Sequence, residues 1–322
     1  MTASVPPEGL SPNAPTDAGR GAGEAHLTLF NHPAYHAMNM RAGQRLFRYD
    51  HWENTRLVGT LTGMVDQGVV DCGYSAPYGG PDLVRSGESA GIVRGFLEGA
   101  IATARREGAR AIRVRARPEF HSRNEAVVLF SLFNLGFAVE RCELTQGIDL
   151  GGLNSSEEYV AHLKSSHRRE LRHGLDALEF HQAETADAWA AAYQVIAVNR
   201  RHRGLQLKIS LEYVLRLRDI FSPRIRMYQL STEGTLIAAA LVYRVRSDCD
   251  YVVAWGDDRT RRDLAPINVL AYRLVEHAFA ERVRLVDIGI SSVDGIPDDG
   301  LIEFKRHILA TSGLRLDLMR EL

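Results

Sequence analysis

The stretch YVVAWGDDRTRRDLAPINVLAYRLVEHAFAERVRLVDIGI, residues 251–290, carries the pattern that decides the fold. An apolar strand at its start gives way to a basic turn, and a helix with a continuous apolar stripe follows from Pro266. Proline suits the first helical position, because its missing N–H has no intrahelical partner there. A second apolar strand closes the stretch, so the order is strand, helix, strand.

Further helices and strands are predicted on both sides of this stretch. Upstream, Ser155 and Glu158 form a capping box that begins a helix running to about residue 175. Periodicity then predicts helices over 187–202, 211–220, 266–281 and 302–309, and strands over 224–232, 235–245, 250–256, 284–290 and 313–319. After its opening helices, the second half therefore reads β-β-β-α-β-α-β.

The first half repeats that order without obvious sequence similarity. Strands are predicted over 45–51, 56–63, 69–75, 110–118 and 137–150, and helices over 89–107 and 124–135. Residues 1–25, rich in proline and glycine, are predicted to be a flexible tail. We expect two tandem domains, 26–150 and 151–322, of the α/β (α+β) class, each a mixed, mostly antiparallel sheet flanked by helices.

The composition argues against several classes of protein. The 322 residues include 39 Lys and Arg against 40 Asp and Glu, so bulk charge does not suit a chain that coats DNA or a membrane. The longest apolar run, residues 236–243, is far shorter than a membrane-spanning helix. Three separated cysteines offer no disulfide framework and no zinc motif, so we expect a cytoplasmic protein.

Four motifs, in order along the chain, resemble the GNAT acyltransferases and, among them, the FemAB-like and CelD-like families. Residues 251–268 resemble the segment that enters the central helix of that group. Val286–Gly289 resembles its fDfG strand end, and Gly300–Lys305 resembles its GL..FK helix. The basic helix SSHRRELRHGL, residues 165–175, resembles the helix that opens the second domain, and the repeated topology implies tandem GNAT domains.

Two departures from the family pattern leave the acyl donor open. The Q/R-x-x-G-x-G/A loop that cradles the CoA pyrophosphate in many GNAT enzymes is absent between Trp255 and Pro266. The expected FK..FG continues as FKRHIL, residues 304–309, without the second aromatic residue and the glycine. The resemblance therefore implies either acyl-CoA or an aminoacyl-tRNA as co-substrate.

The resemblance places the donor between two splayed parallel strands, whose unpaired backbone groups orient a carbonyl and stabilise an oxyanion. The N-terminus of the helix at Pro266 would face the donor phosphates, because free N–H groups and the helix dipole favour anions there. The expected donor-binding residues are Trp255, Gly256, Arg259, Arg261, Arg262, Pro266 and Asn268. Alternatively, the three arginines belong to a solvated turn.

Three residues are candidates for catalysis. Lys305 matches the lysine of the FK pair, which in the Fem enzymes helps to stabilise charge beside the reacting centre; the alternative is an ordinary surface lysine. Asp287 ends a buried strand, where a carboxylate is costly unless it is catalytic or paired, and pairing with Lys305 is the simpler role. Asp294, in the following loop, is the alternative base.

Residues that bind the acceptor are expected on the basic helix and in the cleft. Lys164, Arg168 and Arg172 recur every four residues and share one helix face, which suits an anionic ligand. The full expected set is Lys164, Arg168, Arg172, Tyr78, Tyr251 and Ser291. A second basic cluster, residues 199–203, is more simply a solvated helix face, and the histidines show no metal-ligand spacing.

The resemblance therefore implies an N-acyltransferase that moves an acyl group from acyl-CoA to an amine, and the composition predicts that it is cytoplasmic. The resemblance implies an amino sugar, an envelope precursor or a natural-product peptide as acceptor. No DNA partner, metal or integral membrane span is expected. Two alternatives stay open: a tRNA-dependent aminoacyltransferase of the Fem type, and a non-catalytic binding protein with the same fold.

Overall fold

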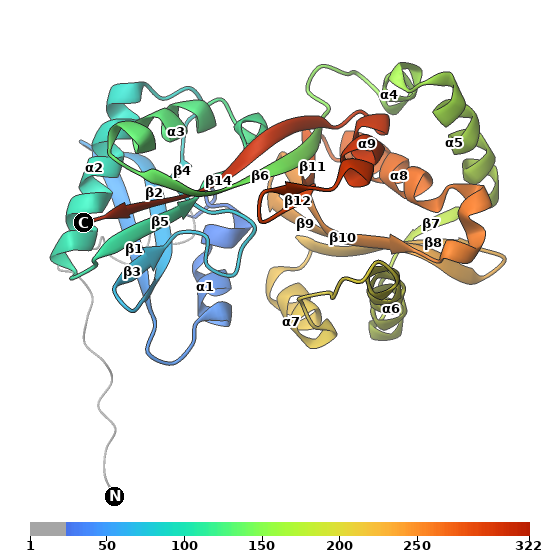
Figure 1. Ribbon diagram of the computed structural model, residues 1–322, viewed down its shortest axis with the longest axis horizontal. Coiled ribbons are helices and arrows are strands. Elements are labelled where there is room, and N and C mark those ends of the chain that lie inside the picture. The colour runs from blue at the N-terminus through green and yellow to red at the C-terminus, as the bar shows by residue number, and fades with distance from the viewer. Residues whose placement is uncertain (1–23) are drawn as a thin grey trace, which may run out of the picture.

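A single sheet runs through both halves of the chain in the computed structural model, which describes residues 24–322 (Figure 1). Residues 1–23 of the predicted tail therefore lie outside the described residues. The strands of the sheet are β1 (Arg45–Glu53), β2 (Arg56–Asp66), β3 (Val69–Asp71), β4 (Asp82–Leu83), β5 (Ala111–Arg115), β6 (Ala138–Asp149), β7 (Glu179–Gln182), β8 (Ile225–Thr232), β9 (Thr235–Arg246), β10 (Cys249–Asp257), β11 (Leu285–Ile290) and β14 (Thr311–Glu321). Their spatial order is β1-β2-β3-β5-β14-β6-β11-β10-β9-β8-β7, with β4 paired to β2.

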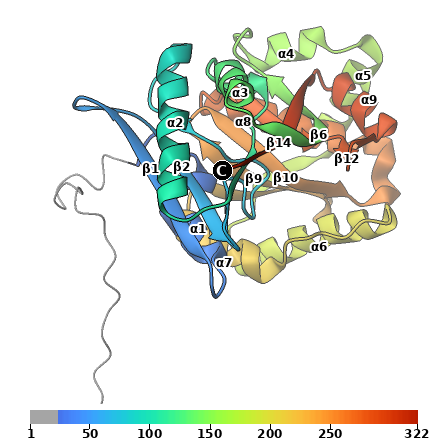
Figure 2. The ribbon, with the colours of Figure 1, turned by 60° about the vertical axis from the view of Figure 1, so that its left-hand side comes forward.

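Helices cover both faces of this sheet. They are α1 (Pro33–Asn39), α2 (Ala90–Arg106), α3 (Glu125–Asn134), α4 (Ser156–His162), α5 (Ser165–Ala177), α6 (Ala186–His202), α7 (Leu211–Phe221), α8 (Pro266–Ala280) and α9 (Asp299–His307), with short 3-10 turns η2 (Leu29–Asn31), η3 (Glu119–His121) and η4 (Arg259–Leu264). In the second half α4, α5, α8 and α9 lie on one face and α6 and α7 on the other (Figure 1). In the first half α2 packs across β1 and β2 (Figure 2). None of the helices in residues 24–322 is both long and apolar enough to span a bilayer.

Two long strands connect the halves. β6, the last strand of the first half, pairs antiparallel with β11 of the second half. β14, at the C-terminus, runs antiparallel to β6 on one side and to β5 on the other, so the end of the chain lies in the first half (Figure 1). The sheet is thus continuous across the domain boundary predicted near residue 150, and the division into two domains stays a prediction.

An aromatic cluster also joins the halves. Phe30 and Tyr78 of the first half are buried, and their rings meet edge to face with centroids 5.3 Å apart. Phe30 also lies edge-on to Tyr251 of β10 at 6.3 Å. Burying an aromatic side chain stabilises a fold by roughly 1.5–3 kcal/mol, so this cluster contributes strongly to holding the halves in one arrangement.

The predicted strands and helices follow one another in the predicted order with further elements between them, and the fold class, a mixed and mostly antiparallel sheet flanked by helices, is confirmed. One predicted helix is wrong, because α4 ends at His162 and α5 begins at Ser165. Leu163 and Lys164 between them have extended backbone angles, which interrupts the helical hydrogen bonds. Ser155 caps α4 as predicted, accepting a hydrogen bond from the Glu158 N–H at 3.2 Å. Helix α1, strands β4 and β7, and the hairpin β12 (Ser292–Val293) with β13 (Ile296–Pro297) were not predicted.

Candidate active site

The parallel strands β10 and β11 separate soon after they meet. Their ladder ends at the pair Tyr251↔Asp287, although both strands continue. β10 carries an extra residue, Val253, in its pairing with β9, and β11 is irregular against β6 between Asp287 and Ile290. Such bulges bend a strand away from its neighbour. The strands are therefore splayed at the position that the resemblance implied for the donor.

Lys305 of α9 binds the part of β11 that no longer pairs with β10. Its side chain is buried, and Nζ donates hydrogen bonds to the carbonyl oxygens of Gly289, at 2.8 Å, and Ile290, at 3.0 Å. Burial lowers the pKa of Lys305 to about 7; Asp287 opposes the shift, and the nearby Arg200 adds to it. The alternative of an ordinary surface lysine is therefore wrong, because this amine is desolvated beside the splayed strands.

Asp287 contacts a residue that the sequence analysis did not select. Its Oδ2 lies 2.8 Å from Nε2 of His121, which belongs to the first half of the chain, and its Oδ1 accepts the Gly289 N–H at 2.8 Å. The expected direct pair with Lys305 is replaced by this arrangement. His121 gave no sequence signal, because 166 residues separate it from its partner and only the packing of the two halves brings them together.

Two tyrosines line the same region. A Cβ atom on Gly289 would lie 3.3 Å from the Tyr251 hydroxyl, so this hydroxyl sits beside the splayed part of β11. The buried Tyr78 ring lies edge to face with His121, at 4.7 Å, and with Tyr251, at 5.9 Å. Burial raises the pKa of both tyrosines, and both hydroxyls therefore stay protonated near neutrality and can donate hydrogen bonds.

Two half-buried arginines face Tyr251 and were also missed. Arg200 lies on α6, within the basic cluster interpreted above as a solvated face, and Arg315 lies on β14. Burial lowers the pKa of both guanidinium groups, and the Tyr251 hydroxyl acts on each in the opposite direction. Neither has an ion-pair partner among residues 24–322, and Nε of Arg315 is buried without a hydrogen-bond acceptor. Together with Lys305, they place three basic side chains around the site, with Asp287 near Lys305 and with Asp317 and Glu143 near Arg315.

The N-terminus of α8 borders a hollow of about 460 Å³. Its N-cap, Ala265, has a left-handed backbone (φ 45°, ψ 51°) and supplies no capping side chain. Pro266 has no N–H, and the Asn268 and Val269 N–H groups donate to the Ala265 carbonyl oxygen at 3.0 and 3.1 Å, so the Ile267 N–H is the one left for a ligand among the first residues of the helix. The lining consists of Glu170, Asp257, Arg262, Asp263, Ala265, Pro266, Ile267 and Asn268. Arg259 is exposed, and Arg261 lies 3.6 Å from Asp263. Because three carboxylates line this hollow beside one arginine, it is less basic than the sequence implied.

The other two residues expected at the donor have packing partners. The Trp255 ring lies edge to face with Phe304 of α9, with centroids 5.9 Å apart. A Cβ atom on Gly256 would come within 2.8 Å of the Asn199 side chain, so glycine allows α6 to approach β10 closely. Asn199 also donates to the Asp257 carbonyl at 2.9 Å. The assignment of Trp255 and Gly256 to the donor stays a prediction.

The basic helix is used partly for local structure. Arg168 donates to the carbonyl oxygens of Ala161 and Leu163 and so satisfies the end of α4. Lys164 is the exposed N-cap residue of α5, and Arg172 is exposed on the same helix. The side chains of Lys164 and Arg172 are therefore free to bind a ligand, whereas Arg168 uses N–H donors for the end of α4.

Two expected residues lie around the hairpin that follows β11. Ser291 is buried and donates to Oε1 of Gln146 at 2.6 Å. Asp294 is 69% exposed and forms an ion pair with Arg141 at 2.7 Å. The Asp294 carboxylate therefore faces the surface, whereas Asp287 lies inside the site.

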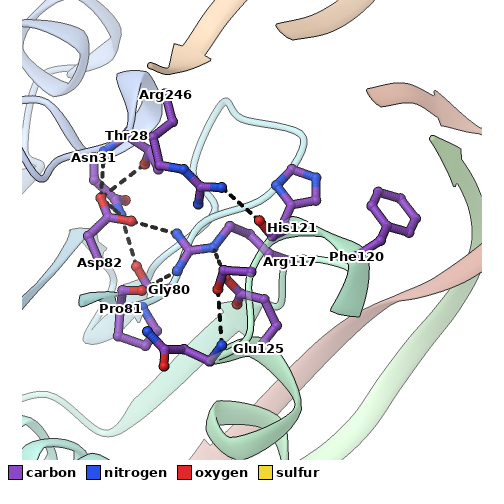
Figure 3. Close-up of polar contacts among 12 residues, drawn as sticks. Thr28, Asn31, Gly80, Pro81, Asp82, Arg117, Phe120, His121, Glu125 and Arg246 are labelled. Atoms are coloured by element: carbon purple, nitrogen blue, oxygen red, sulfur yellow. Dashed lines mark hydrogen bonds and ion pairs between the residues drawn. The ribbon is translucent and has the colours of Figure 1, made fainter. Parts of the chain in front are cut away.

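A cavity of about 720 Å³ lies between the halves, and His121 lines it. Arg117 also lines it, and its guanidinium pairs with two further lining residues, Asp82 at 2.6 Å and Glu125 at 3.0 Å (Figure 3). Arg246 donates to the His121 carbonyl oxygen at 2.7 Å and so fixes the loop that carries His121 (Figure 3). Residues 24–322 contain no group of three or more His, Cys, Asp or Glu side chains arranged to hold a metal ion.

Comparison with known proteins finds a family match within the second half of the chain and similar folds over most of it. Residues 161–306 match the family model of the acetyltransferase (GNAT) domain. The crystal structure of FemX superposes with a TM-score of 0.71 over 91% of this chain and 92% of that chain, at 12% identity. The C-terminal domain of a putative lysylphosphatidylglycerol synthetase from Agrobacterium fabrum gives 0.52 over 81% and 80%, at 13% identity. L-PGS from Bacillus licheniformis gives 0.50 over 86% and 83%, at 12% identity. No functionally curated protein matches by sequence.

Proposed function

We propose that this chain, an acyltransferase of the GNAT superfamily with the fold of FemX, transfers an acyl group from acyl-CoA to the amine of an anionic acceptor. The observation that carries the proposal is the splayed pair β10 and β11, with the buried Lys305 on the carbonyl oxygens of β11. A gap between parallel strands leaves backbone groups free to orient a thioester, and a desolvated cation beside it stabilises developing negative charge.

The chemistry follows from the donors that these residues offer. The neutral amine attacks the thioester carbonyl, the C–N bond forms, and the C–S bond breaks as the tetrahedral oxyanion collapses. The leaving thiolate takes one proton, and a second is released when the acceptor begins as an ammonium ion. Protonated Lys305 has three N–H donors, of which two bind Gly289 and Ile290, so the third is available to the oxyanion. The Tyr251 hydroxyl is a second donor.

The charge of the acceptor is inferred from Arg200 and Arg315. Half-buried guanidinium groups that form no ion pair with another described residue are costly, and a bound phosphate or carboxylate would offset that cost. Phosphorylated amino sugars and envelope precursors combine an amine with such an anion, and we place the acceptor in this class. The three cysteines are free, in keeping with a reducing, cytoplasmic compartment for such precursors.

The proposal is tested with the purified chain, acetyl-CoA and matched pairs of amines that differ only in a phosphate or carboxylate group. We expect release of free thiol and an acylated product whose mass rises by one acetyl group, with the anionic member of each pair preferred. Lys305→Met should lower both signals by about 100-fold or more, whereas Arg306→Gln, at a neighbouring exposed residue, should keep them.

The two alternatives give different outcomes. A tRNA-dependent enzyme would show no thermal stabilisation by acetyl-CoA and would bind aminoacyl-tRNA with an affinity that falls steeply with salt, because phosphate contacts release counterions. A non-catalytic binding protein would be stabilised by acetyl-CoA or by an anionic amine without forming product. Either result would contradict acyl-CoA-dependent transfer.

A further inference from the structure

His121 enters the site of the second half from the first half. It ends the turn η3, directly after β5, and is fully buried. Arg246 and Arg284 of the second half each donate to its carbonyl oxygen at 2.7 Å. Arg284 also donates to the Phe120 carbonyl oxygen at 2.9 Å. The backbone of this loop is therefore held against the end of β9 and the start of β11, and the position of the imidazole is well defined.

An unbroken series of hydrogen bonds leads from His121 to Lys305. Nε2 of His121 lies 2.8 Å from Oδ2 of Asp287, and Oδ1 of the same carboxylate accepts the Gly289 N–H at 2.8 Å. The Gly289 carbonyl oxygen in turn accepts Nζ of Lys305 at 2.8 Å. The Gly289 N–H and the Gly289 carbonyl belong to the two peptides on either side of its Cα, so the series passes through the backbone torsions of Gly289 as well as through hydrogen bonds.

Gly289 is the pivot of this series. Its backbone has φ +73°, a left-handed conformation that glycine adopts without the penalty of a side chain. The peptide that follows carries the carbonyl that binds Lys305, so its orientation depends on how the Gly289 N–H is held. Asp287 holds that N–H, and His121 holds Asp287.

We propose that His121 is a positioning residue for Lys305: acting through the Asp287 carboxylate and the Gly289 peptide, the first half of the chain sets the place of the amine in the site of the second half. This role rests on the proposed acyltransferase function. It assigns to the first half a direct part in the chemistry, so neither half holds a complete site by itself.

The main competing account is that the contact between His121 and Asp287 only joins the halves. In that case its loss would lower stability without acting specifically on Lys305. A matched control is Tyr213→Phe, which removes another hydrogen bond between the halves, from the Tyr213 hydroxyl to Oδ1 of Asn39 at 3.2 Å, and which takes no part in the series from His121 to Lys305. The comparison of the two changes separates positioning from simple attachment.

The kinetic test uses His121→Ala, His121→Gln and the double variant His121→Ala/Lys305→Met. We expect His121→Ala to lower kcat by about 10-fold or more with KM for acetyl-CoA changed less than about 2-fold, because a displaced catalytic group costs rate rather than donor binding. His121→Gln keeps a side-chain N–H donor and should recover most of kcat. In the Lys305→Met background, His121→Ala should cost little more, since residues in one series are not additive. If the kcat losses of the two single variants multiplied in the double variant, the two residues would act independently and the proposal would be overturned.

A second measurement does not depend on activity. In the nuclear magnetic resonance spectrum of the lysine side chains, the Lys305 signal is identified by its disappearance in Lys305→Met. His121→Ala should shift this signal, whereas Tyr213→Phe should leave it in place. Should His121→Ala not fold, His121→Gln and the isosteric Asp287→Asn report on the same series. An unmoved Lys305 signal in folded variants would refute the positioning role, whereas a moved signal in a chain without turnover would refute only the proposed function.

Discussion

Each half of the molecule contains a pair of parallel strands, but only one pair is open. In the second half β10 and β11 diverge after Tyr251↔Asp287, and side chains border the gap. In the first half β3 and β5 pair in parallel, and the chain then turns back between their ends. There the Cys72 N–H donates to the Arg113 carbonyl at 2.8 Å, and the Gly79 N–H donates to the Arg115 carbonyl at 2.9 Å.

Glycine makes this closure feasible. A Cβ atom on Gly79 would lie only 1.4 Å from the Cys72 carbonyl oxygen, so the loop and the strand end are in direct backbone contact. Arg115 adds hydrogen bonds to the carbonyl oxygens of Gly73, at 3.2 Å, and Ala76, at 2.7 Å. The same topology thus gives an open, cation-bordered gap in one half and a gap filled by main chain in the other. The difference favours the second half as the donor site.

The largest effect on activity is expected at the open gap. Lys305→Met should lower kcat by about 100-fold to 1,000-fold, the usual cost of removing one donor to an oxyanion. Thiol release from acetyl-CoA measures this directly. Arg306→Gln on the same helix is the control, because that side chain is exposed. A variant at Lys305 with full turnover would remove the lysine from the mechanism.

The largest effect on stability is expected at the closed gap. Gly79→Ala should lower the free energy of unfolding by about 3 kcal/mol or more, because the new methyl group meets backbone atoms that cannot move aside. Gly95→Ala on α2, where a Cβ atom would meet nothing within 4 Å, should instead stabilise the protein by up to about 1 kcal/mol. Denaturant unfolding compares the two. Equal stabilities would mean that the loop does not fill the first gap.

The pH dependence tests the burial of Lys305. Its pKa is about 7 in the folded chain against an ordinary value of 10.5, so between these values the unfolded chain binds one more proton. The stability of the wild type relative to Lys305→Met should therefore rise as pH increases from about 7 to 10.5. Thermal unfolding at several pH values measures this difference. A constant difference would place Lys305 in solvent.

A smaller effect is expected at the acceptor. Arg315→Gln should raise KM for an anionic acceptor by about 10-fold, since a charge-assisted hydrogen bond to a half-buried anion contributes about 1.5–3 kcal/mol. KM for acetyl-CoA and kcat should change little. Arg94→Gln, which breaks an exposed ion pair with Glu98 on α2, serves as the control. An equal loss with neutral amines would argue against an anionic acceptor.

The smallest effect is expected at Asp294. Its carboxylate is exposed and pairs with Arg141 at the surface, so Asp294→Asn should change kcat by less than about 2-fold. Initial rates at saturating substrates suffice for this comparison. A loss as large as that of Lys305→Met would restore Asp294 as the catalytic base and shift the site toward the hairpin.

Local pattern was sufficient for most of the fold and for one central residue. Alternation and helical periodicity predicted β8 to β11 and α8 within a residue or two, and the FK motif selected Lys305. The break between α4 and α5 was missed because the sequence pattern stays helical through Leu163 and Lys164. The break is visible only in the extended backbone angles of these two residues. His121, Arg200 and Arg315 were missed because their roles depend on neighbours that are distant along the chain.

By itself, the sequence determined the order of the predicted strands and helices and the repeated topology, because burial and hydrogen bonding within short segments follow residue type. The FK motif also selected Lys305 as a site residue. Only the tertiary structure decided which of the two strand pairs opens, and that a histidine of the first half reaches the carboxylate of Asp287. The reason is physical: a bulge, a backbone contact at a glycine and a buried hydrogen bond between halves are all fixed by packing between segments far apart in sequence.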